Sequence, residues 1–564
     1  MTDSCSLFTG VLLPTLTRVK AHYTSPLSHF LTEETHLHSS AMAEEYSVDD
    51  PTQLLEASSE FANYPGVQND ASAHEFLDRF PLPVILNALQ TKADVPGLEN
   101  TLVDVLESIF KIRYGASLIP QYMPFIQVGL TADSQKVKAL ACKTVTRLLE
   151  SVNDYAVSAH LIIDNNIYPL LIDCLINGNE QVTTLTTEAI AKIAGSPAGI
   201  DIVFPADANE ATHLGKLASQ CSSLGRVRIL ALIVKLFSVS HDVASVVSKS
   251  NLLRLFEAEI NSNDTLATLN VMELLYELSE IKHGRVFLST STLMQLLSSI
   301  ISNQSMDSIL RSRAMIISGR LLSNGNYILS DESSAKTVVS AIDRILSSSE
   351  SHDTDECETA LEALGQIGSS MEGAQLLLSS SPPAARHVVY FAFDRQGHGR
   401  QLAALHALAN ISGETRSENS VILTSDTEES LRRLIYETAS KSSKLTPSGL
   451  FLSVIQQDPE TRLAVYRVLT GLGARPWCLM EICSKQEIIN IVTDAASETT
   501  KIGMEARYNC CKTIHTAFNM SSKLSSDPAL GGIAAKLHES VRLGPYLARK
   551  HREAQPTVVT ADRF

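Results

Sequence analysis

The sequence predicts an all-α protein, an armadillo/HEAT-type α-solenoid wound as a right-handed superhelix of about nine to eleven helical repeats. One observation is a period of about 40 to 46 residues, at which apolar helical segments of similar texture end on a small or polar residue. These ends fall at Ser151, Ser196, Ser240, Glu280, Ser323, Ser369 and Ser412, with two more near Ala474 and Asn519. The other is composition: 44% apolar but only 5% aromatic residues suit helices that pack through Leu, Ile, Val and Ala.

The N-terminal part is expected to hold two segments. Residues 1–41 are rich in Ser, Thr and His and poor in charge, so we expect a disordered N-terminal extension. Asp50 suits a helix N-cap and Pro51 the first helical position, which predicts the start of the folded part. Residues 42–115 are helical but irregular in pattern, and we interpret them as an N-terminal helical cap.

The regular armadillo/HEAT repeats are expected over residues 116–415. One repeat shows the pattern well, with helices predicted over residues 155–164, 167–177 and 181–194 and a short polar turn after each of the first two. Three helices per repeat are typical of the armadillo form.

The spacing of the repeats lengthens after Gly413. We interpret the extra residues as a long loop with one added helix over residues 428–440. Asp458 and Pro459 then give another N-cap and first-turn signal. The C-terminal segments are therefore an inter-repeat insertion over 416–457, C-terminal repeats over 458–543 and a flexible tail over 544–564.

Charge and hydropathy narrow the class of partner. A net charge of −16 and a pI near 5.5 argue against nucleic acid as a partner, because phosphate binding depends on Lys and Arg. No run of 18 apolar residues is present, so we expect no membrane span. The nine cysteines have scattered spacings and an odd count, which is typical of buried reduced thiols.

Residues that could do chemistry are few. Cys510, Cys511 and His515 lie within about one helical turn of one another, but no nearby CxxC or HxxxH supplies further zinc ligands. Cys478 and Cys483 are poorly spaced for a metal. Neither a Gly-x-Ser-x-Gly elbow nor a Walker-type phosphate loop occurs. We therefore predict no catalytic residue, no cofactor and no metal.

Paired polar residues form a more informative pattern. In five repeats the last predicted helix, which lines the concave groove of an armadillo protein, has polar residues at i and i+4 and so on one face. The candidate partner-binding residues are Lys143 and Arg147, Glu188 and Lys192, Glu273 and Glu277, Glu362 and Gln366, and His406 and Asn410.

These pairs predict a ladder of mixed sign along the groove. It would be basic at its N-terminal end and acidic in the middle, around Glu273, Glu277 and Glu362. Such a groove would suit a charged helical protein domain better than a nucleic acid. The same pairs also fit ordinary solvated faces of surface helices, so both interpretations stay open.

Several segments resemble one known family. Residues 282–288, Lys-His-Gly-Arg-Val-Phe-Leu, are similar to its His-Gly-Arg element, and residues 364–373 to its Gly-Ser-x-x-Glu-Gly junction. Pro476 and Trp477 resemble its Pro-Trp pair, about 70 residues before a C-terminal Gly-Pro-Tyr at 544–546. In this order and spacing, the segments resemble the family of 26S proteasome non-ATPase regulatory subunit 5, the assembly chaperone of the proteasome base. We expect a plant-type or otherwise divergent member.

The resemblance implies an ATP-independent assembly chaperone rather than an enzyme. Its implied partners are the C-terminal domain of a proteasomal base AAA-ATPase subunit, held in the concave groove, and associated base subunits. It also implies a protein of the cytoplasm, with the nucleus as a further location, that is a monomer when free. The alternative is another armadillo-type adaptor in transport or the ubiquitin pathway. An import receptor would line its groove with Trp and Asn, and this chain has one Trp.

Overall fold

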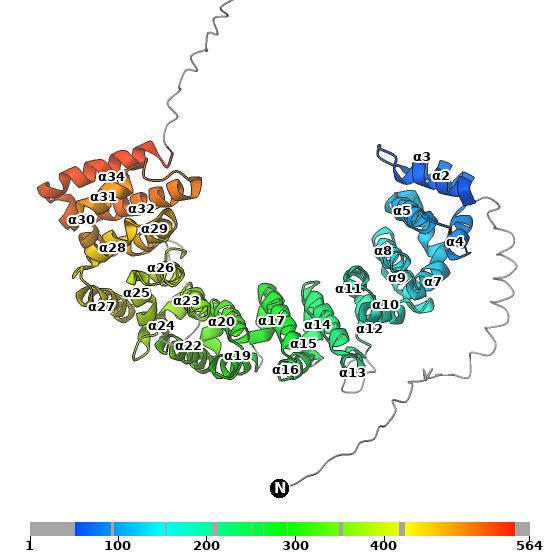
Figure 1. The fold of residues 1–564 in the computed structure, drawn as a ribbon, viewed down its shortest axis with the longest axis horizontal. Helices are drawn as coiled ribbons and strands as arrows, with labels where there is room; N and C mark the ends of the chain where they lie inside the picture. The colour runs from blue at the N-terminus through cyan, green and yellow to red at the C-terminus, as the bar shows by residue number, and fades with distance from the viewer. Residues whose placement is uncertain are drawn as a thin grey trace, which may run out of the picture. The chain divides into compact units, whose positions relative to one another are not determined.

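A computed structural model describes residues 51–91, 95–152, 155–205, 213–250, 252–262, 264–289, 292–348, 354–416 and 423–546. Helices make up 81% of these residues. No β-strand occurs among them, in agreement with the predicted fold class (Figure 1). The extension expected over 1–41 and the tail beyond residue 546 lie outside the described residues.

The chain divides into two compact units. Unit 1 comprises residues 1–174 and 179–185, and unit 2 comprises residues 175–178 and 186–564. The division falls within two helices, α10 (Ile167–Asn177) and α11 (Glu180–Ala194).

Unit 1 is built of helices of four to 17 residues. They are α2 (Pro51–Ala62), α3 (Asp70–Arg79), α4 (Leu82–Thr91), α5 (Leu98–Lys111), α6 (Arg113–Leu118), the 3₁₀ helix η1 (Ile119–Tyr122), α7 (Met123–Thr131), α8 (Gln135–Ser151) and α9 (Tyr155–Asp164). Their core is made of Leu, Ile and Val, including Leu102, Leu106 and Ile109 of α5, which are fully buried. Helix α5 packs against α2 and α8, which ties the unit together.

Unit 2 continues with helices that come in threes. The earlier triplets are α12 (Pro197–Val203), α13 (His213–Gln220) and α14 (Ser223–Phe237); α15 (His241–Lys249), α16 (Leu253–Ile260) and α17 (Thr265–Glu280); α18 (Lys282–Ser289), α19 (Leu293–Ser302) and α20 (Ser308–Leu322); and α21 (Gly325–Ser330), α22 (Glu332–Ser347) and α23 (Thr354–Ile367). The later ones are α24 (Met371–Ser379), α25 (Ala385–Phe393) and α26 (His398–Ser412); α27 (Ser425–Lys441), α28 (Pro447–Ile455) and α29 (Pro459–Gly473); and α30 (Pro476–Ser484), α31 (Gln486–Thr493) and α32 (Lys501–Met520). The short helices α33 (Ser522–Ser525) and η2 (Pro528–Leu530) and then α34 (Gly531–Leu543) complete it.

The third helix of each triplet packs against the third helix of the next one. In unit 2 this gives a continuous row of α14, α17, α20, α23, α26, α29 and α32, which we call the third-helix row. Figure 1 shows α14, α17, α20 and α23 of this row side by side. The row is the surface on which a repeat protein of this kind displays aligned side chains from successive repeats.

The small polar residues that recur in the sequence have a structural reason. Ser196 and Ser240, which close apolar segments, are the N-caps of α12 and α15, and their hydroxyls accept the backbone N–H of Gly199 (3.1 Å) and Val243 (3.3 Å). Each such cap satisfies a donor that the first helical turn leaves unpaired. The period in the sequence is thus partly a period of helix starts.

Glycine allows close approach at four of these helix starts. A Cβ added at Gly199 or Gly373 would lie 1.7 or 1.8 Å from the backbone carbonyl oxygen of Ile193 or Ile367, in the preceding third helix. Gly115 and Gly284 occupy the same position in α6 and α18. A side chain there would force the two helices apart, so the residue type is dictated by packing.

The interval 416–457 differs from the expected loop with an added helix. Its described part holds α27 and α28, which pack against each other, and α28 packs against α29. These three helices form an ordinary triplet, whose first helix α27 is 17 residues long while α24 has nine. The repeat spacing lengthens both because this helix is eight residues longer than α24 and because the connection before it, residues 413–424, is longer than the one before α24.

The start of the expected tail is also ordered. Gly544 ends α34 with φ +81°, and the Pro545 carbonyl accepts a hydrogen bond from Nη2 of Arg507 at 3.4 Å. The Tyr546 hydroxyl bonds to Glu505 of α32. Arg507 is fully buried, so these contacts fix residues 544–546 on the last repeat.

Within the described residues, no single helix is both long and apolar enough to cross a membrane. Helices α9 and α10 together pass by length and composition, but they are bent by 72° at their junction.

Candidate protein-binding surface

The predicted candidate residues lie on α8, on α11 and, in unit 2, on third helices of triplets. Lys143 and Arg147 are on α8, and the pair Glu188 and Lys192 is exposed on α11. The remaining pairs are Glu273 and Glu277 on α17, Glu362 and Gln366 on α23, and His406 and Asn410 on α26. They lie on the helices that the sequence predicts, but several of them form ion pairs or packing contacts that the prediction did not include.

The pair on α8 is neutralised. The Lys143 ammonium lies 2.7 Å from a carboxylate oxygen of Glu107 on α5, and Arg147 pairs with Glu150 at 2.6 Å. Burial raises the pKa of Glu107, but hydrogen bonds from Lys111 and Lys143 outweigh it, and the net shift is downward. The prediction of a basic N-terminal end is therefore wrong, because each cation already has an acidic partner.

The middle of the row is mixed in charge rather than acidic. Arg313 and Arg320 of α20, the helix between α17 and α23, form ion pairs with Glu273 and Glu280 of α17. Both guanidinium groups also lie over the Tyr276 ring, 5.9 and 5.6 Å from its centroid. The prediction missed these arginines because they are seven residues apart, not four.

The pair on α23 is partly used in packing. Nε2 of Gln366 donates to an oxygen of Glu362 at 3.2 Å, while Oε1 of Gln366 is buried 3.0 Å from where a Cβ of Gly319 would be. Glu362 is exposed, whereas Gln366 fits against the glycine of the neighbouring helix α20. Only Glu362 is available to a partner.

The pair on α26 belongs to an inter-helix network. Arg467 of α29 donates to Nδ1 of His406 (2.8 Å) and to the Asn410 side-chain oxygen (3.1 Å), and it pairs with Glu414 (2.9 Å). Burial, followed by the charge of Arg467, lowers the pKa of His406. These residues stabilise the contact between α26 and α29, so they are less accessible than the prediction assumed.

In the middle of the third-helix row, charged residues that stay accessible to a partner lie on three adjacent helices. We define the charged face as Glu273, Glu277 and Glu280 of α17, Arg313 and Arg320 of α20, and Glu362 of α23. Its four glutamates are exposed and its two arginines are half-buried. Such a face can exchange ion pairs with a charged protein surface.

The cysteines have the properties of core residues. Cys510 and Cys511 are fully buried, and burial raises the pKa of both thiols. Burial likewise raises the pKa of Cys478, and that of Cys483 to about 11. A thiol held protonated in this way is a poor nucleophile and a poor ligand.

One trio of possible metal ligands occurs among the described residues. His398, Asp458 and Glu460 are all exposed, and His398 lies 4.0 Å from Asp458 and 3.8 Å from Glu460. Asp458 is the N-cap of α29 and accepts two backbone N–H groups, which explains its position and the lowered pKa of its carboxyl. The trio therefore does not show a built site, and the absence of a metal stays a prediction.

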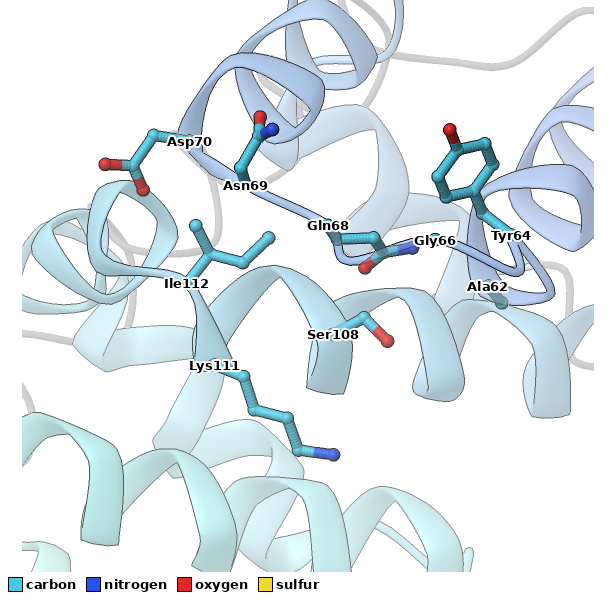
Figure 2. Close-up of a pocket in the computed structure, with 9 residues that line it drawn as sticks. All are labelled: Ala62, Tyr64, Gly66, Gln68, Asn69, Asp70, Ser108, Lys111 and Ile112. Atoms are coloured by element: carbon cyan, nitrogen blue, oxygen red, sulfur yellow. The ribbon is translucent and has the colours of Figure 1, made fainter.

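A pocket in unit 1 lies between the α2–α3 loop and the end of α5. Figure 2 shows that the Lys111 side chain points away from Asp70, and that the Tyr64 hydroxyl is directed away from Ser108. Lys111 is paired with Glu107 at 2.8 Å. The polar groups do not converge on one point, as a small-molecule site requires.

Three repeats share an arginine–glutamate ion pair that was not predicted from the sequence, and we call it the arginine clamp. Arg226, Arg311 and Arg462, each four residues after an N-cap, pair with Glu259, Glu356 and Glu498, which are almost fully buried. Each arginine also donates to the carbonyl just before its N-cap, in Cys221, Met306 and Gln457 respectively. The common spacing from the N-cap was a signal in the sequence, but the glutamate partners are 33 to 45 residues away.

The stacked triplets and the charged face on their third helices define an armadillo-like α-solenoid, a class of protein-binding scaffold. The sequence model described as "Proteasome non-ATPase 26S subunit" matches residues 85–563. The chain belongs to this family, and its role is related to the proteasome.

Curated relatives support the same assignment. The chain is similar to 26S proteasome non-ATPase regulatory subunit 5 of Bos taurus and of Homo sapiens, each 22% identical over 73% of this chain and 79% of the relative. The protein of that name from Mus musculus is 21% identical over 79% and 85%. At 21–22% identity to these relatives, the chain is a divergent member of the family.

Solved structures similar to the chain include an engineered protein, with 14% identity and a TM-score of 0.43 over 75% of this chain and 99% of that one. A designed armadillo repeat protein in complex with the peptide (KR)4 has 16% identity and a TM-score of 0.29 over 42% and 98%. No functional conclusion follows from likenesses at these scores.

Proposed function

We propose that this chain is an ATP-independent assembly chaperone of the 26S proteasome base. In this proposal the charged face binds the C-terminal domain of one proteasomal AAA-ATPase subunit before the base is complete. Membership of the family, over residues 85–563, is the observation that supports it most. We also propose that the protein is a monomer when free, resides in the cytoplasm and acts by binding rather than by catalysis.

The properties of the charged face support a role in protein binding. Its ion pairs are exposed: the side chains of Glu273 and Arg313 are 48% and 32% accessible. Exposed pairs of this kind contribute less than about 1 kcal/mol, so a partner can replace them at little cost. Because α17, α20 and α23 pack as rigid helices, the face needs little ordering on binding.

Charge reversal on this face tests the proposal. The purified C-terminal domain of each base ATPase would be titrated by calorimetry against the wild type and the double variant Glu277→Lys, Glu362→Lys. We expect one domain to bind the wild type, and the variant to bind it at least about tenfold more weakly, because like charges then meet at the interface. The melting temperature should not change, since both side chains are exposed.

A matched reversal gives the control. Glu332 on α22 and Glu429 on α27 are 65% and 64% exposed and lie outside the third-helix row. The variant Glu332→Lys, Glu429→Lys should bind like the wild type. If none of the ATPase domains binds the wild type, the proposal is wrong, and the alternative of another armadillo-type adaptor gains support. If the face variant binds normally, the contact lies elsewhere.

A further inference from the structure

Three apolar side chains stand exposed at the start of neighbouring third helices. Leu224, Leu266 and Ile309 are the second residues of α14, α17 and α20, and 60%, 71% and 61% of their surfaces are exposed. We call them the apolar rim. Exposing one such residue is ordinary, but three at the same position of adjacent helices make a repeated feature.

The three positions are neighbours in space. Helix α17 packs against both α14 and α20, and Figure 1 shows the three side by side. The Ser223 hydroxyl of α14 donates to the Asp264 carboxylate at the N-cap of α17 (3.2 Å), so the two helices start at the same edge. Packed helices lie about 8–10 Å apart, which sets the spacing of the rim.

The fold does not require apolar residues here. Elsewhere the second residue of a third helix is polar or glycine, with one further apolar case at Ile502; these residues are Lys136, Gln181, Asp355, Gly399 and Glu460. The first turn of a helix faces solvent and favours polar side chains. The rim therefore departs from the pattern of its own repeats without a packing reason.

The charged groups next to the rim residues are negative in sum, although the group beside Ile309 reaches to α23, on the side of α20 away from α17. Arg226 is paired with Glu259 and lies near Asp264, and Arg311 is paired with Glu356 and lies near Asp307. Each group thus has one positive and two negative charges. The partial positive charge of a helix N-terminus, roughly half an elementary charge, reduces this excess but does not cancel it.

We propose that the apolar rim docks a basic amphipathic helix of the protein partner. This deepens the proposed function, on which it rests, by naming the chemistry of the bound element. Residues seven apart on a helix lie on one face about 10.5 Å from each other, which is close to the spacing of the rim. Leucines at such positions would cover Leu224, Leu266 and Ile309, and flanking lysines would face Asp264 and Asp307.

A synthetic peptide tests the inference without any ATPase. The probe is a fluorescein-labelled helical peptide of 21 residues, with Leu at positions 4, 11 and 18 and Lys beside each Leu, designed on that spacing. Fluorescence anisotropy should show saturable binding to the full chain. The variant Leu224→Ser, Leu266→Ser, Ile309→Ser should weaken binding at least about tenfold, because each contact loses buried apolar area.

Two further variants separate apolar contact from charge. Asp264→Asn and Asp307→Asn keep both N-caps, since Asn caps as well as Asp, and should weaken binding and its salt dependence. Leu329→Ser on α21, at a site 71% exposed like Leu266, should have no effect. Circular dichroism should show every variant folded.

Several outcomes would overturn the inference. They are failure of the peptide to bind, equal binding of a peptide with Glu in place of each Lys, and normal binding by the folded triple Ser variant. A wild-type dimer that the triple Ser variant loses, seen by light scattering, would make the rim a contact between two copies. If the peptide fails while an ATPase domain still binds, the inference is wrong and the proposed function stands.

Discussion

Arg475 shows how much one buried charge depends on its counter-ion. It is 4% exposed, and its Nε lies 2.8 and 2.9 Å from the two carboxylate oxygens of Glu428 on α27. Glu428 also accepts the indole N–H of Trp477 at 3.0 Å. A guanidinium out of water must be paired to be tolerated, so Glu428 stabilises the junction of two triplets.

We expect Glu428→Gln to lower the free energy of unfolding by roughly 2–3 kcal/mol, because it leaves the charge of Arg475 without a counter-ion. Urea denaturation followed by circular dichroism would measure the loss. The adjacent Glu429→Gln is the control: its partner Arg432 is exposed, so its effect should be below about 1 kcal/mol. Equal effects of the two variants would contradict this account.

His387 predicts a dependence of stability on pH. Burial, followed by the charge of Arg386, lowers its pKa to about 4; Asp343, 3.4 Å away, opposes the shift but is already paired with Arg386. Between pH 6.5 and about 4, His387 therefore binds a proton in the unfolded chain but stays neutral in the folded chain. His387 thus favours unfolding as pH falls below about 6.5 and toward 4, by roughly 3 kcal/mol in all.

The variant His387→Gln should flatten this dependence. Urea denaturation at pH 7 and pH 5 should show a smaller loss of stability for the variant than for the wild type. His241→Gln, at an exposed position on α15, should behave like the wild type. An unchanged loss in the His387 variant would show that other groups cause the pH dependence.

At the scale of the element, the close approaches at Gly115, Gly199, Gly284 and Gly373, which we call the glycine joints, make a sharp prediction. A Cβ at Gly373 would lie 1.8 Å from the Ile367 carbonyl oxygen, so Gly373→Ala must separate α24 from α23. We expect a loss of about 2 kcal/mol or more in the free energy of unfolding. Gly532→Ala in α34, where no heavy atom lies within 4 Å, should instead gain about 0.5–1 kcal/mol. Similar losses in both would rule out close approach as the reason for glycine.

The arginine clamp between α20 and α23 predicts non-additive effects. Arg311 and Glu356 are 10% and 1% exposed, and Nε of Arg311 lies 2.6 Å from the carboxylate. Arg311→Met or Glu356→Met alone leaves a buried charge and should cost roughly 3–5 kcal/mol. The double variant should cost less than either single one. Additive losses in a double-mutant cycle would show that the pair is not a coupled unit.

Whether a structural feature can be predicted from the sequence depends on how far apart in the chain its contacting residues lie. The helical fold, the period and the N-cap at Asp458 were predictable, because Asp458 and the helix it starts are adjacent in the chain. The charge of the binding surface was not, since Glu273 meets Arg313 across 40 residues. Which residues face one another across two helices depends on their relative register, and the period does not define this to a single residue.

At the scale of the whole molecule, the repeats imply that unfolding is not one event. Each triplet contacts chiefly its neighbours, so stability is distributed along the chain rather than held in one core. Trp477, the only tryptophan, lies at the start of α30 and reports on the C-terminal repeats alone. Far-UV circular dichroism reports on all helices.

We therefore expect the two signals to give different midpoints in a urea titration. Glu428→Gln should shift the fluorescence midpoint more than the circular dichroism midpoint, because Glu428 binds Trp477 directly. Coincident midpoints in both proteins would indicate a single cooperative unit instead.

The glycine joints also define a rule for rearranging the chain. They occur at the start of α6, α12, α18 and α24, in every second triplet and 84 to 89 residues apart, whereas the triplets between them start with side chains such as Val243 at the same position. The unit that could be duplicated or lost without altering any junction is therefore a pair of triplets. Lengthening or shortening such a protein by about 85 residues would preserve its joints, while a change of about half that length would place unlike surfaces in contact.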